Sequence, residues 1–213
     1  MATTTAAASP SRRPDGADLA LGLGALGFIS LALIPVRIHR AFGLPAHPLI
    51  LHVPVILVPL LGVTLLAAAA RPSLFQRHAI AIGAFTVLTL ASTILTVGAG
   101  QAFRDDRANF REAHRLNEHA QSGETLRLVM ILVAAVVLAA VLLSQARPGS
   151  RLGFLSPLAG SRGVRLALRA LFAIGAVAAI FFAIRTGHLG AQLTWQRDEG
   201  RPPPGFRPPP RGP

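Results

Sequence analysis

The apolar residues of this chain form long uninterrupted runs rather than the one-sided stripes of a soluble helix. The run from Leu44 to Ala70 contains no Asp, Glu, Lys or Arg. At 1.5 Å per residue, a helix over this range would be roughly 40 Å long, which exceeds the ~30 Å hydrocarbon core of a bilayer. The run therefore predicts a helix that crosses a membrane.

Four further runs have the same character, so we expect five crossings in all: 19–36, 44–70, 79–99, 128–143 and 166–184. This pattern predicts an all-α integral membrane helical bundle, with a four-helix core and one extra N-terminal transmembrane helix. We divide the chain into a disordered leader (1–18), the extra helix (19–36), the four-helix membrane domain (43–195) and a disordered Pro/Arg-rich tail (196–213).

Composition supports a protein of the cell membrane. Charged residues make up 14% of the chain and hydrophobic residues 52%, whereas about 25% of a soluble domain is charged. The absence of cysteine excludes disulfides, thiolate metal sites and iron–sulfur clusters. All 21 basic residues are arginines, and they lie mainly in connections and tails, where they anchor helices in the lipid bilayer. We therefore expect no nucleic-acid partner.

The central run carries ionisable and helix-bending residues near its start. Pro54 and Pro59 cannot donate backbone hydrogen bonds, so they should bend the helix. His47 would lie near the helix start and His52 about one turn deeper. Because ionisable groups are costly in a membrane, these histidines mark a candidate functional site.

The number of crossings decides which connections share a face of the membrane. With five crossings, the first and third connections and the C-terminal segment lie on one side. Six histidines fall there and only His78 falls opposite: His39, His47, His52, His114, His119 and His188. The second and fourth connections carry arginines without acids, as cytoplasmic loops do. We therefore expect a cytoplasmic N-terminus and an outward histidine face.

Motifs at both ends of the four-helix domain resemble those of a known family. They are Gly43-Leu-Pro-Ala-His47-Pro-Leu-Ile-Leu-His52-Val-Pro54, then Gly100, His119 and Gly187-His188-Leu-Gly190-Ala-Gln-Leu-Thr-Trp195. The chain resembles the bacterial membrane proteins of domain of unknown function 2231, over Gly43 to Trp195. The resemblance implies a four-helix membrane core and points to the same histidines, but it brings no established activity. Gln101 stands where that family often has Glu.

A haem b site for electron transfer is our leading functional hypothesis. Haem iron in helical membrane bundles is held by imidazoles from facing helices. We expect His52 and His119 as the first pair, with His47 and His188 as a second pair or as supporting groups, and Arg127 as the partner of a propionate. The simplest alternative is that these imidazoles only hydrogen-bond to backbone at a helix interface.

Other functions stay open. His114, Glu118 and His119 form a candidate metal-binding set, since residues four apart share a helix face. A small-solute transporter, a homo-oligomer, or an accessory or assembly subunit of a membrane redox complex would also suit the composition. We find no nucleophile–base pair, phosphate-binding glycine loop or paired carboxylates within the apolar runs, so hydrolase and kinase chemistry is not expected.

Overall fold

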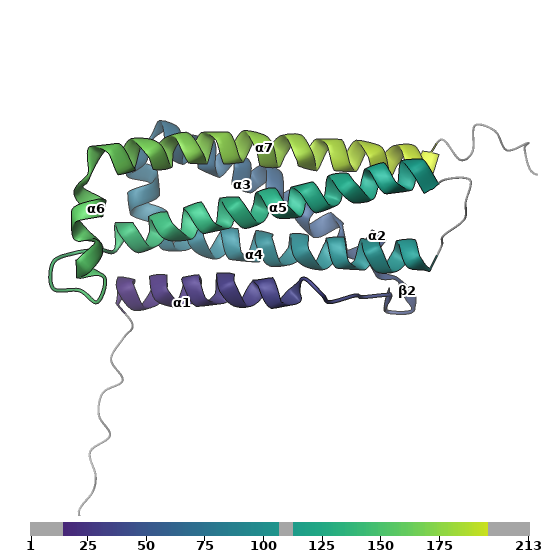
Figure 1. Cartoon of the computed structure of the whole chain (residues 1–213), viewed down its shortest axis with the longest axis horizontal. Coiled ribbons are helices and arrows are strands. Elements are labelled where there is room, and N and C mark those ends of the chain that lie inside the picture. Colours follow the sequence, from purple (N-terminus) through teal and green to yellow (C-terminus); the bar gives the residue numbers. More distant parts are fainter. Residues whose placement is uncertain (1–14, 107–112, 196–213) are drawn as a thin grey trace, which may run out of the picture.

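The computed structural model describes residues 15–106 and 113–195, and it confirms an all-α helical bundle (Figure 1). Five long helices lie roughly side by side: α1 (Gly16–Ser30), α3 (His52–Ala70), α4 (Pro72–Asp105), α5 (Ala113–Ser144) and α7 (Arg162–Trp195). Short elements join them: η1 (Leu31–Leu33), β1 (Arg40–Ala41), β2 (Leu44–Pro45), α2 (Ala46–Ile50), η3 (Gly153–Leu155) and α6 (Ser156–Gly160). Within the described residues, five helical stretches are long and apolar enough to cross a membrane.

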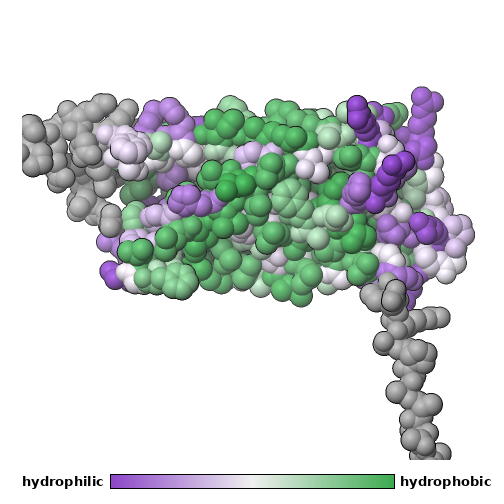
Figure 2. Space-filling model, turned by 180° about the vertical axis from the view of Figure 1, so that it is seen from behind, coloured by the Kyte–Doolittle hydropathy of each residue, from purple (hydrophilic) through white to green (hydrophobic). Residues whose placement is uncertain are grey.

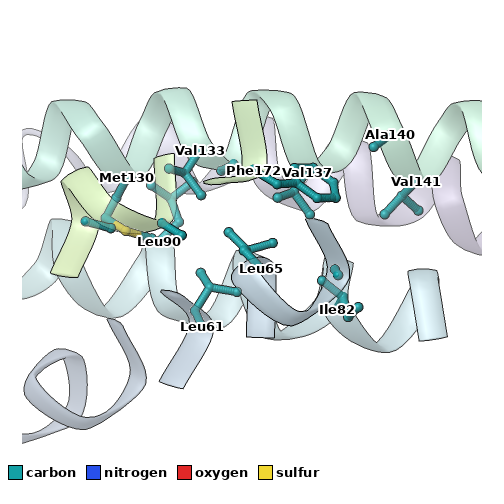
Figure 3. Packing of buried hydrophobic residues seen from close by; sticks show 14 of the residues in the cluster. Leu61, Leu65, Ile82, Leu90, Met130, Val133, Val137, Ala140, Val141 and Phe172 are labelled. Carbon is teal, nitrogen blue, oxygen red and sulfur yellow. The ribbon is translucent and has the colours of Figure 1, made fainter. Parts of the chain in front are cut away.

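The core lies between α3, α4, α5 and α7, which form the four-helix domain. Leu61 and Leu65 of α3 meet Leu90 of α4 and Met130 of α5 there (Figure 3). Lipid tails are as apolar as these side chains, so close packing rather than escape from water holds the helices together. Glycines allow the close approach: a Cβ on Gly62 would lie 2.6 Å from Ile180.

The outer surface is an apolar belt with hydrophilic side chains at both ends (Figure 2). Large apolar side chains on the outside are exposed on every long helix, for example Phe28, Val63, Leu88, Leu132 and Ile174. Such a surface is stable against lipid and unstable in water. The bundle is therefore built to lie in a bilayer.

The N-terminal helix begins earlier than the hydrophobic run predicts. Asp15 caps α1, and its side chain accepts a hydrogen bond from the backbone N–H of Asp18 at 2.8 Å. Since an N-cap satisfies a free backbone donor, the helix starts at Gly16 rather than Leu19. The last residues of the expected disordered leader are thus helical. Its first 14 residues and the expected tail at 196–213 lie outside the described part of the chain.

The central run is two helices rather than one. Helix α2 ends at Ile50 and α3 begins at His52, because Pro54 has no N–H to donate to the carbonyl of Ile50. A tight β1–β2 hairpin precedes α2, and its two turn residues, Phe42 and Gly43, have φ of 51° and 78°. Positive φ at both positions is what the type I′ form of a two-residue hairpin turn requires.

The two ends of the bundle carry different elements (Figure 1). The β1–β2 hairpin, α2, the end of α4, the start of α5 and the end of α7 lie at one end, which we call the α2 end. The starts of α1 and α7 lie at the other with α6, and we call it the α6 end.

Candidate functional site

His47 is held at the α2 end by two features of α4. Its Nδ1 lies 3.1 Å from the carbonyl oxygen of Thr96. A carbonyl can only accept, so Nδ1 carries the proton and donates it. The ring also packs on Gly100, one turn further along α4, where a Cβ would lie 3.0 Å from His47 Cε1. A side chain at position 100 would therefore make the imidazole shift by a few tenths of an ångström.

His119 of α5 is held by α7 in the same way. Its Nδ1 lies 3.1 Å from the carbonyl oxygen of Thr186. The ring packs on Gly190, where a Cβ would lie 3.0 Å from His119 Cε1. A hydrogen bond of 2.8 Å between the hydroxyls of Ser122 and Thr186 joins α5 to α7 beside the ring.

The two imidazole seats are therefore copies of one arrangement. Each consists of a histidine near the start of one membrane-spanning stretch, α2–α3 or α5, and a Thr-x-x-x-Gly sequence near the end of the next long stretch, α4 or α7: Thr96 to Gly100, and Thr186 to Gly190. The two helical hairpins are α2–α3 with α4, and α5 with α7. Both begin at the α2 end, so the repeat is parallel rather than inverted (Figure 1). Sequence reasoning missed both seats, although the repeated Thr-x-x-x-Gly spacing was a usable signal.

The two seats bring the histidine rings together. The ring centroids of His47 and His119 are 6.1 Å apart, and the rings are inclined by 74°. Phe103 stacks on His47 with a centroid separation of 6.2 Å. Because Nδ1 of each histidine is protonated, each Nε2 keeps a lone pair. The site therefore presents two neighbouring imidazole lone pairs, which can bind a metal or accept a proton.

Three partly buried polar side chains, Gln101, Glu124 and Arg127, lie between α4 and α5 near the same end. Gln101 Nε2 donates to Glu124 Oε1 at 2.8 Å. Gln101 Oε1 and Arg127 Nη1 are both buried, and neither has a hydrogen-bond partner within residues 15–106 and 113–195. A buried donor or acceptor left unpaired is destabilising by about 1–3 kcal/mol, and more when it is charged. Arg127 Nη1 is thus suited to an acceptor that the chain itself does not supply.

The other two predicted haem-site histidines point elsewhere. His52 is exposed at the start of α3, and His188 is exposed on α7, where Gln192 Nε2 donates to its Nε2 at 2.9 Å. The ring beside His119 is that of His47, whereas our first choice had been His52. Five helical residues turn the chain by roughly 140°, so His47 and His52 face different directions.

The structure does not test the predicted metal set. The side chain of His114 lies outside the described part, and Glu118 is exposed. Among the described residues, no group of three or more His, Cys, Asp or Glu side chains is arranged to hold a metal ion. The set remains a prediction.

Long apolar helices, an apolar outer surface and a half-buried polar site at one end define a multi-pass helical membrane protein. The chain belongs to the family described as "Predicted membrane protein (DUF2231)", whose sequence model matches residues 43–200. This confirms the resemblance read from the motifs. The match includes both imidazole seats and leaves α1 outside. No curated protein and no solved structure matches the chain.

Proposed function

We propose that this protein binds haem b between His47 and His119 and transfers electrons within the membrane. The pair of equivalent imidazole seats carries the proposal. In haem b the porphyrin supplies four nitrogen ligands, so two imidazoles complete the coordination of the iron. Histidines that bind metals commonly donate their other ring N–H to a backbone carbonyl, and both of these do so.

The separation of the two rings matches the one expected around a single iron ion, and ordinary edge-to-face ring contacts have a similar separation. With a metal–nitrogen distance of about 2 Å, two imidazoles on opposite sides of one ion have ring centroids roughly 6 Å apart. The observed separation is 6.1 Å. A structural zinc ion would need four ligands, and the described residues provide no group of even three. Two imidazoles therefore suit a porphyrin-bound metal better than a bare zinc ion.

Arg127 suits the carboxylate of a haem propionate. Its buried Nη1 has no hydrogen-bond partner among the described residues, and a guanidinium binds a carboxylate through strong charge-assisted hydrogen bonds. Glu124, already bonded to Gln101, would lie on the same helix one turn before Arg127. In this arrangement the ligand neutralises a charge that the helices leave unpaired.

The distribution of arginines favours one orientation for the proposed site. Among the described residues, seven exposed arginines lie at the α6 end, and Arg37, Arg40, Arg115 and Arg185 are exposed towards the α2 end. The positive-inside rule places the end richer in arginine in the cytoplasm. The N-terminus would then be cytoplasmic and the histidine pair near the outer face. Electron transfer also needs a redox partner, for which a membrane redox complex or a second copy of the chain is suited.

The absorption spectrum of the purified full-length protein tests the proposal. Expressed with haem supplied, the wild type should show a Soret band with about one haem per chain. The double variant His47→Ala/His119→Ala should lose it, whereas the matched control His52→Ala/His188→Ala should keep it. If the imidazoles only join the two hairpins, the wild type will show no Soret band, or the control and the test variant will retain equal haem.

A further inference from the structure

The α6 end has a strongly cationic surface. Seven arginines are exposed there: Arg71, Arg77, Arg147, Arg151, Arg162, Arg165 and Arg169. Figure 2 shows hydrophilic side chains gathered at this end, next to the apolar belt. Within the described residues, the only acids at this end are Asp15 and Asp18 of α1, and Asp18 is already paired with Arg151 at 3.1 Å.

Three of these arginines lie on one face of α7. Arg162, Arg165 and Arg169 are three and four residues apart, so their side chains follow one another along the helix. Like charges at this spacing destabilise a helix, and cations near a helix N-terminus oppose its dipole. Within α7 itself the arginine stripe is therefore unfavourable, and an anion bound to it would relieve the repulsion.

Backbone carbonyls hold two of the guanidinium groups in place. Arg165 Nη1 donates to the carbonyl of Gly160 at 2.7 Å, and Arg169 Nε donates to the carbonyl of Ala69 at 2.8 Å. Each bond uses one of the five N–H donors of the guanidinium. The remaining donors are held at the junction of α3, α6 and α7, so little side-chain freedom is lost when they bind an anion.

We propose that the stripe of Arg162, Arg165 and Arg169 binds the phosphate of an anionic phospholipid. Guanidinium groups bind phosphate oxygens in pairs, and the stripe extends about 10 Å along the helix axis. Exposed apolar side chains continue along α7 beside it, at Leu166 and, further on, Val177. These would contact acyl chains, which a soluble phosphate lacks. The proposal is independent of the haem site.

Lipid binding by the full-length protein tests the stripe. We would measure bound phosphatidylglycerol by native mass spectrometry, after mixing with phosphatidylglycerol and phosphatidylcholine. Arg162→Gln/Arg165→Gln/Arg169→Gln should reduce the apparent affinity for phosphatidylglycerol by about tenfold or more. The control Arg71→Gln/Arg77→Gln/Arg147→Gln removes the same charge from the same end, so it reports the diffuse attraction, and its loss should be clearly smaller than that of the stripe variant. Arg162→Gln alone breaks none of the carbonyl contacts and should still weaken binding.

The outcomes distinguish a specific lipid-binding site on the stripe from general electrostatic attraction between the α6 end and anionic lipid. Equal losses in the two triple variants would overturn the proposal, as would unchanged binding in the stripe variant. If the stripe variant does not fold, an unchanged affinity in Arg162→Gln decides against the site. Inorganic phosphate that displaces the lipid at millimolar concentration would identify a free anion as the ligand instead.

Discussion

The two hairpins hold equivalent imidazoles with different supports. In the α2–α4 seat, a Cβ on Gly100 would lie 3.0 Å from Cε1 and 3.1 Å from Nδ1 of His47, and Phe103 stacks on the same ring. In the α5–α7 seat, a Cβ on Gly190 would lie 3.0 Å from Cε1 of His119 but 3.5 Å from Nδ1. There the hydroxyl pair of Ser122 and Thr186 lies beside the ring. Both seats share the carbonyl hydrogen bond and the glycine contact, and the additional support is a stacked phenyl ring in one and a hydroxyl pair in the other.

This contrast indicates what the repeat preserves. The carbonyl acceptor and the glycine recur in both hairpins, whereas the additional support differs. Those two features fix which ring nitrogen is free and where the ring lies. The proposed ligand depends on those properties alone, so the two seats should be equal in ligation and unequal in their tolerance of mutation.

The largest effect should come from removing either imidazole. His47→Ala and His119→Ala should each abolish six-coordinate haem, because one axial ligand is lost in both cases. Optical spectra of the ferric protein, with and without added imidazole, measure this. Added imidazole should restore the six-coordinate spectrum in both variants. If only one of the two variants loses six-coordinate haem, the seats are not equivalent.

The glycines should reveal the difference in packing. Gly100→Ala should be destabilising by about 1–3 kcal/mol relative to the control Gly187→Ala, because the new methyl group meets two ring atoms. Gly190→Ala should be milder, since its methyl group closely approaches only one. Apart from its own helix backbone and chain neighbours, no atom of the described residues lies within 4 Å of a Cβ at Gly187, so that variant reports the general effect of alanine in α7. Thermal unfolding in detergent gives the order, and a larger loss at Gly190 would contradict it.

The smallest effects should come from the supports that the seats do not share. Ser122→Ala removes the 2.8 Å hydroxyl contact with Thr186 and should be destabilising by about 1 kcal/mol. Phe103→Leu removes the stacking on His47 and should be destabilising by about 0.5–1.5 kcal/mol. Hydrogen exchange should show the first change at α5 and α7 and the second at α2 and α4. Exchange that changes equally in both hairpins would mean that the supports are not local.

The membrane fold follows from the sequence because lipid limits what can span a bilayer. Apolar runs such as Leu44 to Ala70 must be helical to satisfy their backbone groups, which is why five spans were predicted and found. Helix ends depend on local hydrogen bonds instead. The cap at Asp15 and the break caused by Pro54 therefore moved boundaries that hydrophobicity alone placed elsewhere.

The site was less predictable, because it depends on how each helix is rotated. The expected depth of His52 in the membrane, about one helical turn below His47, favoured it as the partner of His119. The structure places His47 there instead. The side chain's direction around the helix decides this, and apolar runs without stripes do not reveal it. Gly100 and Gly190 act through contacts with rings far along the chain, so their role became visible only when the helices were packed.

Electron paramagnetic resonance of the oxidised, haem-loaded wild type tests the shared iron most directly. Two imidazoles on one iron should give a low-spin ferric signal that accounts for nearly all of the bound haem. A high-spin signal, or a sample without stoichiometric haem, would contradict ligation by His47 and His119.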